Sequence, residues 1–260
     1  MPGPILRLSH VHKSFGDGTV ALDDLSLTVE RGEFVSVVGP SGCGKSTMLR
    51  IIAGLSQATR GHVEHDTDDI GYVFQDATLL PWRTVRRNVE LPAELRGLPR
   101  AERRRRAAEA IALVGLDEFA GYRPRALSGG MRMRVSLARA LTMLPSLFLF
   151  DEPFGALDAI NRERLGEELQ ALYAHRRFAA VFVTHAVSEA VFLSSRVLVM
   201  AARGGNIVAD VPVPIPFPRP AEARYATELA GIAAEVHAHL RKGAAEPSSE
   251  TVALGSEEAS

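Results

Sequence analysis

The sequence has little cysteine and lysine, and its opposite charges nearly cancel. Cys43 is the only cysteine in 260 residues, which rules out an intrachain disulfide and favours a reducing, cytosolic compartment. Lys and Arg number 30 against 31 Asp and Glu, so no general basic field exists and we expect no nucleic-acid partner. No apolar run approaches the roughly 18 residues that cross a bilayer, and the first residues lack the basic-then-apolar order of a secretory signal.

The remaining composition suits a folded α/β protein. Hydrophobic residues make up 46% of the chain, enough for one large domain or for two lobes that share a core. Short strands are expected within residues 5–38 and at 61–64. Further along, strands alternate with helical patterns, which is typical of a parallel sheet with crossover helices; the strands of this series are expected at 34–38, 70–74, 147–150, 179–183 and 196–200.

Two segments depart from this alternation. Residues 84–140 are helical in pattern and rich in arginine. The four consecutive arginines at 103–106 wrap right around a helix, so we interpret them as a solvated face rather than a nucleic-acid or lipid site. Five prolines between 212 and 220 predict an extended connector. An amphipathic docking helix and a disordered tail from Gly243 are then expected, the helix with apolar contacts at Tyr225, Leu229, Ile232, Val236 and Leu240.

A phosphate-binding loop follows the strand expected at 34–38. It matches G-x-x-x-x-G-K-[ST] and precedes a helix expected at 45–55. Its glycines let backbone N–H groups turn toward phosphate oxygens at the positive end of that helix. Lys45 would reach the β- and γ-phosphates and Ser46 would ligate Mg²⁺, so ATP and Mg²⁺ are the expected ligands. The residues assigned to ATP binding here are Gly39, Pro40, Ser41, Gly42, Cys43, Gly44, Lys45, Ser46 and Thr47.

Polar side chains follow three of the expected strands. Asp151 and Glu152 are adjacent, and adjacent residues of an extended chain point to opposite sides, so they can have different roles. We assign Asp151 to the metal and Glu152 to the activation of a water that attacks the γ-phosphate. Gln75 and His185 follow two other strands. Because the carboxyl ends of parallel strands converge on one crevice, we expect these four side chains to meet there.

A second helix start also has the composition of an anion site. Ser128, Gly129 and Gly130 precede an amphipathic helix, where a hydroxyl and free backbone N–H groups favour phosphate. A single nucleotide does not reach both helix starts of one subunit. Two subunits placed head to tail allow it, because each supplies the loop for one ATP and the Ser-Gly-Gly start for the other. The motifs therefore predict a homodimer in the ATP-bound state.

These motifs, in this order and spacing, resemble those of the ATP-binding subunits of ABC transporters over roughly residues 5–218. The resemblance implies an α/β fold with a P-loop NTPase (RecA-like) core, an N-terminal antiparallel β part and an inserted α-helical lobe at about 77–142. The ATPase domain would span 1–218, the docking helix 219–242 and the tail 243–260. Implied roles are adenine stacking for Phe15, the signature for Ser128, Gly129 and Gly130, the D-loop for Asp158, metal contact for Ser46, Gln75 and Asp151, and catalysis for Lys45, Gln75, Glu152 and His185.

Within that family, residues 74–84 and 182–193 are similar to nitrate/sulfonate/taurine importers and to the related thiamine-precursor importers. This implies two permease subunits, an extracytoplasmic solute-binding protein and a peripheral position on the cytoplasmic face of the inner membrane. The signature ends in Met131 instead of the usual glutamine, and Met133 stands at a second position where glutamine is common. The Ser-Gly-Gly start is intact, so we expect activity to survive these departures.

Several alternatives stay open at this point. A soluble ABC ATPase of translation or chromosome work would carry two cassettes or a long coiled-coil insert. A nucleotide-gated scaffold would not need Glu152 and His185, a P-loop kinase would not need the Ser-Gly-Gly start, and an exporter subunit would more often be fused to its membrane domain. Residues 79–82, Leu-Leu-Pro-Trp, allow either a local core around Trp82 or a groove for a permease helix.

Overall fold

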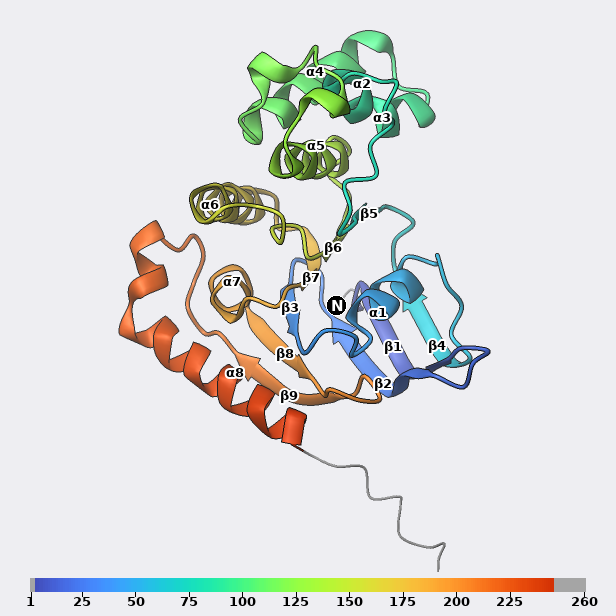
Figure 1. Ribbon diagram of the computed structural model, residues 1–260, viewed down its shortest axis with the longest axis vertical. Helices are drawn as coiled ribbons and strands as arrows, with labels where there is room; N and C mark the ends of the chain where they lie inside the picture. The colour runs from blue at the N-terminus through green and yellow to red at the C-terminus, as the bar shows by residue number, and fades with distance from the viewer. Residues whose placement is uncertain (1–2, 246–260) are drawn as a thin grey trace, which may run out of the picture.

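The computed structural model describes residues 3–245, whose strands form two sheets (Figure 1). The smaller sheet is antiparallel with the order β2-β1-β4; its strands are β1 (Leu6–Ser14), β2 (Val20–Val29) and β4 (Arg60–His65). The larger sheet has the order β5-β6-β7-β3-β8-β9 and is parallel except at β9; its strands are β3 (Phe34–Val38), β5 (Ile70–Val73), β6 (Leu147–Asp151), β7 (Ala179–Val183), β8 (Arg196–Met200) and β9 (Ile207–Pro212). The expected α/β class is confirmed.

Helices pack on the larger sheet and also form a separate lobe, seen at the top of Figure 1. The lobe contains α2 (Val85–Val89), α3 (Leu91–Leu95), α4 (Arg100–Leu113) and α5 (Gly129–Leu141). The other helices are α1 (Lys45–Ile52), α6 (Ala159–Arg176), α7 (Val187–Leu193) and α8 (Thr227–Ala245). Within residues 3–245 no helix is both long enough and apolar enough to cross a membrane.

The central strands of the larger sheet are buried on both faces because their side chains alternate between two cores. Leu147 and Leu149 of β6 belong to the core that includes α1 and the antiparallel sheet. Phe148 and Phe150 belong to the core on the other face, with α5, α6 and α7, and their stacked rings have centroids 5.4 Å apart. This packing fixes the end of β6, and therefore the position of the acids that follow it.

The C-terminal helix docks on the edge of the sheet, but it begins later than the apolar spacing predicts. α8 lies along β8 and β9 and buries Leu229 and Val236 (Figure 1). The prediction that Tyr225 opens its buried face is wrong: Tyr225 ends a 3₁₀ turn and is 77% exposed. α8 continues through Gly243 to Ala245, so the prediction of a disordered tail is wrong for residues 243–245. The rest of that tail, 246–260, lies outside the described residues.

Strand β9 is an element that the sequence patterns do not predict. It pairs with β8 at the sheet edge and ends at Pro212, where the missing N–H removes no hydrogen bond to β8.

The arginine run lies on α4. Arg105 pairs with Glu102 at 2.8 Å and with Glu109 at 2.6 Å. Arg104 and Arg105, at the centre of the arginine run, are exposed to solvent, and the absence of a nucleic-acid or lipid contact stays a prediction.

Candidate functional site

The loop between β3 and α1 has a backbone that requires glycine. Gly42 and Gly44 have φ values of +81° and +104°, which side chains with a Cβ atom rarely adopt. A Cβ atom at Gly44 would also lie 2.3 Å from the carbonyl oxygen of Ala21. The loop ends where α1 begins at Lys45, so its N–H groups lie at the positive end of a helix. This is the backbone arrangement that binds phosphate in proteins.

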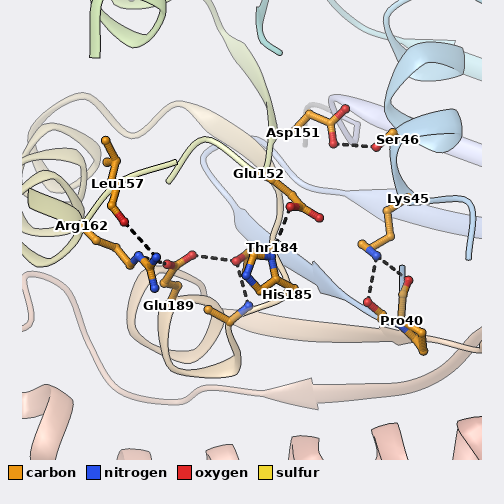
Figure 2. Close-up of polar contacts among 12 residues, drawn as sticks. Pro40, Lys45, Ser46, Asp151, Glu152, Leu157, Arg162, Thr184, His185 and Glu189 are labelled. Carbon is orange, nitrogen blue, oxygen red and sulfur yellow. Dashed lines mark hydrogen bonds and ion pairs between the residues drawn. The ribbon is translucent and has the colours of Figure 1, made fainter. Parts of the chain in front are cut away.

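Lys45 is folded into this loop. Its side chain is 5% exposed, and Nζ donates hydrogen bonds of 2.8 Å each to the carbonyl oxygens of Gly39 and Pro40 (Figure 2). An ammonium in this position stands ready to pair with phosphate oxygens that enter the loop. Cys43, a residue of this loop, is buried, and its Sγ lies 3.8 Å from Nζ of Lys45.

Asp151 and Ser46 form a cluster of oxygen atoms beside the loop. The Ser46 hydroxyl donates a 2.8 Å hydrogen bond to Oδ1 of Asp151, and the Tyr72 hydroxyl donates to Oδ2 at 3.2 Å. Burial raises the pKa of the Asp151 carboxyl, and these two hydrogen bonds oppose that rise. Burial also raises the pKa of Tyr72, and the neighbouring Asp151 adds to the effect. Sequence reasoning missed Tyr72; its only signal was a hydroxyl-bearing residue within an otherwise apolar strand.

The oxygen cluster has the chemistry that Mg²⁺ prefers. Hard cations bind carboxylate, hydroxyl, amide and phosphate oxygens, and Mg²⁺ shares its shell between few protein groups and the substrate phosphates. Among the residues described here, no three or more His, Cys, Asp or Glu side chains form a metal-binding group. Ser46, which is hydrogen-bonded to Asp151 and lines one cavity together with Gln75, therefore fits with these two residues a cation bound jointly with phosphate rather than a closed protein cage.

Glu152 and Asp151 contact different groups, as predicted, but a left-handed backbone at Glu152 rather than an extended one directs its side chain. Its Oε2 lies 3.2 Å from Nδ1 of His185 (Figure 2), whereas Asp151 turns toward Ser46. The backbone of Glu152 has a φ of +46°, a left-handed conformation that is uncommon outside glycine. Its N–H donates to the carbonyl oxygen of Val183 at 2.9 Å, which holds this conformation in place. Strained backbone of this kind collects at functional sites because it aims a side chain.

One cavity of about 540 Å³ collects most of the predicted site. Its walls include the phosphate loop together with Phe15, Gln75, Glu152 and His185, which follow four different strands. Phe15 is about half exposed, and the ammonium of Lys13 lies 5.3 Å from the centre of its ring. Residues separated by as many as 170 positions in the sequence thus meet around a space that suits a nucleotide.

The signature residues lie elsewhere. Ser128 caps α5 in the helical lobe, where its Oγ accepts a 3.2 Å hydrogen bond from the N–H of Met131. None of Ser128, Gly129 and Gly130 lines the cavity. Asp158 caps α6 in the same way, because its carboxylate accepts a 2.9 Å hydrogen bond from the N–H of Asn161. That hydrogen bond lowers the pKa of Asp158.

Comparison with known proteins places this site in a family. A sequence profile described as "ABC transporter" matches residues 22–155. An aliphatic sulfonates import ATP-binding protein, SsuB 1 of Pseudomonas syringae pv. syringae, is 45% identical over 82% of this chain and 87% of its own length. The taurine import ATP-binding protein TauB of Rhizobium johnstonii is 44% identical over 79% of this chain and 82% of its own.

A solved structure matches as well. The dimeric, post-hydrolysis structure of the ATP-binding cassette MJ0796, bound to ADP and Pi, superposes with a TM-score of 0.74 at 34% identity, covering 80% of this chain and 98% of the other. The P-loop NTPase core and antiparallel β part predicted for the fold are thereby confirmed. The chain belongs to the ABC transporter family, as one of its ATP-binding, ATP-hydrolysing subunits.

Proposed function

We propose that this subunit drives an importer for small sulfonates, including taurine. The observation that carries the hydrolytic part is the cavity in which Glu152 and His185 face the phosphate loop. Import and cargo are supported by the relatives, which include import ATP-binding proteins for aliphatic sulfonates and for taurine. These names favour the importer over an exporter subunit or a soluble ABC ATPase. The subunit would act at the cytoplasmic face of the inner membrane.

Uptake measurements in the producing cell test the cargo. Deleting the gene is expected to abolish ATP-dependent uptake of radiolabelled taurine or of an alkanesulfonate, and a plasmid copy is expected to restore it. Uptake of nitrate and of a pyrimidine thiamine precursor are the matched comparisons, because importers of those solutes have similar motifs. Loss of uptake of nitrate alone, or of the thiamine precursor alone, would identify that solute as the cargo instead. Unchanged uptake of all four solutes would contradict the importer proposal.

Each residue of the cavity receives a role in this proposal. Loop N–H groups and Lys45 would bind the β- and γ-phosphates, and Phe15 would stack on adenine. Ser46, Gln75 and Asp151 would hold Mg²⁺, which when bound neutralises phosphate charge. Glu152 would accept a proton from the attacking water, and His185, 3.2 Å away, would orient that carboxylate. A general base must lie within hydrogen-bond reach of the water that it deprotonates. The left-handed backbone at Glu152, which directs its side chain, supports this role.

Lys45→Ala is expected to weaken ATP binding about 10- to 100-fold, because a charge-assisted contact to phosphate contributes about 1.5–3 kcal/mol. Equilibrium titration with a fluorescent ATP analogue measures the effect. Lys242→Ala is the matched control, since it removes one of the other two lysines from an exposed position on α8. Equal affinity of Lys45→Ala and wild type would contradict the assignment of the loop.

The signature residues support a head-to-tail homodimer. Ser128 and its two glycines present an anion-favouring helix start that does not reach the cavity of its own subunit. A partner placed head to tail would bring that helix start to the γ-phosphate, and Asp158 would lie near the same interface. The related cassette MJ0796 is dimeric in its ADP- and Pi-bound structure, which supports this arrangement.

Two exposed apolar side chains on the helical lobe, called here the docking surface, support a permease contact. Trp82 is 68% exposed and Leu95 is 78% exposed. Arg83 and Glu94, their neighbours in sequence, form an ion pair of 2.5 Å that holds the two segments together. Such exposure contradicts a local core around Trp82, although Leu79 does pack against the core. Exposed apolar groups of this kind are typical of a partner site, here for the permease subunits that work with an extracytoplasmic solute-binding protein.

The same lobe offers a physical link from that surface to the cavity. Arg139 of α5 donates to the carbonyl oxygens of Ala77 and Thr78 at 3.1 and 2.9 Å. Asn88 donates to the carbonyl oxygen of Leu80 at 3.1 Å and accepts from its N–H at 2.8 Å. The segment that leads from Gln75 to Trp82 is therefore held by the lobe. A displacement of the lobe by a permease would be passed on to Gln75.

Trp82→Asp is expected to leave the isolated subunit folded and its ATPase rate within about twofold of wild type, since an exposed side chain contributes little to stability. Assembly with the permeases and solute uptake are expected to fall at least tenfold through loss of a buried aromatic contact. Copurification with the permeases and uptake assays measure this. Leu55→Asp, at an exposed apolar position outside the lobe, is the control. Normal uptake by a stable Trp82→Asp variant would overturn the docking surface.

A further inference from the structure

A buried carboxylate with no role in the proposed chemistry lies behind His185. The side chain of Glu189, on α7, is 8% exposed. Its Oε2 accepts a 2.7 Å hydrogen bond from the Thr184 hydroxyl, and its Oε1 lies 3.3 Å from Nε of Arg162. Burial raises the pKa of the Glu189 carboxyl, and the Thr184 hydroxyl and Arg162 oppose that rise. A carboxylate this deep needs both partners, because an unpaired buried charge is costly.

One of the two contacts of Glu189 leads to the loop that bears His185. Thr184 directly precedes His185, and its Oγ also accepts a 3.0 Å hydrogen bond from the N–H of Ala186, which directly follows. The Thr184 side chain therefore ties together both flanks of His185. Glu189 fixes the orientation of that hydroxyl, because Thr184 donates its one proton to the carboxylate and keeps its lone pairs for Ala186.

The other contact of Glu189, with Arg162, leads to the segment that precedes α6. Arg162 donates from Nη2 to the carbonyl oxygen of Leu157 at 3.1 Å, and Leu157 directly precedes Asp158. Figure 2 shows the connected series of contacts from Leu157 through Arg162, Glu189 and Thr184 to the loop that bears His185. Two segments far apart in sequence thus share one buried carboxylate.

We propose that Glu189 is a positioning residue that holds His185 against Glu152 and joins this pair to the Leu157–Asp158 segment. A shift of Leu157 moves Arg162, and Glu189 then either follows or loses its charge partner. Because Asp158 is expected at the subunit interface, dimer contact would be sensed at His185 through this carboxylate. The inference rests on the proposed roles of Glu152 and His185.

Two substitutions of Glu189 in the full-length subunit test this proposal. Glu189→Ala is expected to lower kcat for ATP hydrolysis by about 10- to 100-fold, the range expected when a reacting group is misplaced by about 1 Å. ATP affinity and KM are expected to stay close to wild type, whereas the melting temperature is expected to fall, because Arg162 loses its buried charge partner. Glu189→Gln is expected to lose less, because its amide oxygen still accepts from Thr184 while the charge partner of Arg162 is gone.

Glu168→Gln is the matched control. Glu168 is a half-buried carboxylate on α6 that pairs with Arg164 at 2.9 Å, and burial raises its pKa too. It contacts neither the Leu157–Asp158 segment nor the loop of His185, so the kcat of Glu168→Gln is expected to match wild type.

Thr184 supplies a second pair of variants. Thr184→Val removes the hydroxyl at equal shape and is expected to lower kcat, and Thr184→Ser keeps the hydroxyl and is expected to restore it.

Two outcomes would overturn the inference. One is an unchanged kcat in a folded Glu189→Ala variant. The other is a fall in kcat matched by an equal fall in ATP affinity, which indicates support of the whole nucleotide site rather than of His185. If Glu189→Ala does not fold, the Thr184→Val and Thr184→Ser pair decides by the same criteria. These outcomes differ from the one that would contradict the proposed catalytic roles themselves. That outcome is near-normal turnover of Glu152→Gln, and it does not depend on the Glu189 variants.

Discussion

Replacing Glu152 by glutamine is expected to preserve ATP binding and to lower turnover by about 10²- to 10⁴-fold, the contribution typical of a general base. The amide has the same shape, so the left-handed backbone and the contact with His185 can persist, yet it cannot accept a proton from water. Ser46, Asp151 and Lys45 are expected to keep their hydrogen bonds in this variant, because none of these bonds involves the Glu152 side chain. The loss therefore falls on kcat rather than on affinity.

Phosphate release and equilibrium ATP titration measure the two quantities separately. ATP is also expected to accumulate a dimer of Glu152→Gln, seen by size-exclusion chromatography, because the bound nucleotide is no longer consumed. Glu168→Gln serves as the control for removing a carboxylate without touching the cavity. Turnover of Glu152→Gln within a few-fold of wild type would remove Glu152 from the proposed role.

The parts of this site that sequence predicts are those specified by short, local patterns. The glycine spacing from 39 to 44 is readable because particular positions need left-handed backbone, and Gly42 and Gly44 have it. The convergence of Gln75, Glu152 and His185 follows from topology alone, since each closely follows a parallel strand of one sheet. In a parallel sheet, residues that follow the strands all lie at the same edge of the sheet.

The parts that sequence does not predict depend on contacts between segments distant in the chain. Tyr72 reaches Asp151 only because β5 and β6 are neighbours, and 79 positions separate the two residues. Glu189 looks like one polar residue on a short helix until α6 brings Arg162 to it. Tyr225 has helical spacing, but its helix starts two residues later, and its hydroxyl donates to Glu163 instead of its ring packing in the core. Periodicity gives the face of a helix and not its first residue.

Ser128→Arg is expected to abolish hydrolysis while ATP affinity of the single subunit stays near wild type. Ser128 is exposed in the subunit, so an arginine has room there and costs mainly the cap of α5, about 1 kcal/mol. In a head-to-tail dimer the same arginine would occupy the place of the γ-phosphate. Thr84→Arg is the matched control, because it removes the cap of α2 in the same lobe without facing a phosphate, and its ATPase rate is expected to match wild type.

Mixing Ser128→Arg with Lys45→Ala tests whether the two motifs act across the interface. In a mixed head-to-tail dimer one site contains both lesions and the other contains neither. If subunits pair at random, about a quarter of all sites are intact, and ATPase activity is expected to return to roughly that fraction. Activity that stays at zero while mixed dimers form leaves two explanations, strictly coupled sites or a wrong dimer. A dimer of wild type with the doubly substituted subunit has one lesion in each site, so activity there would contradict the head-to-tail arrangement.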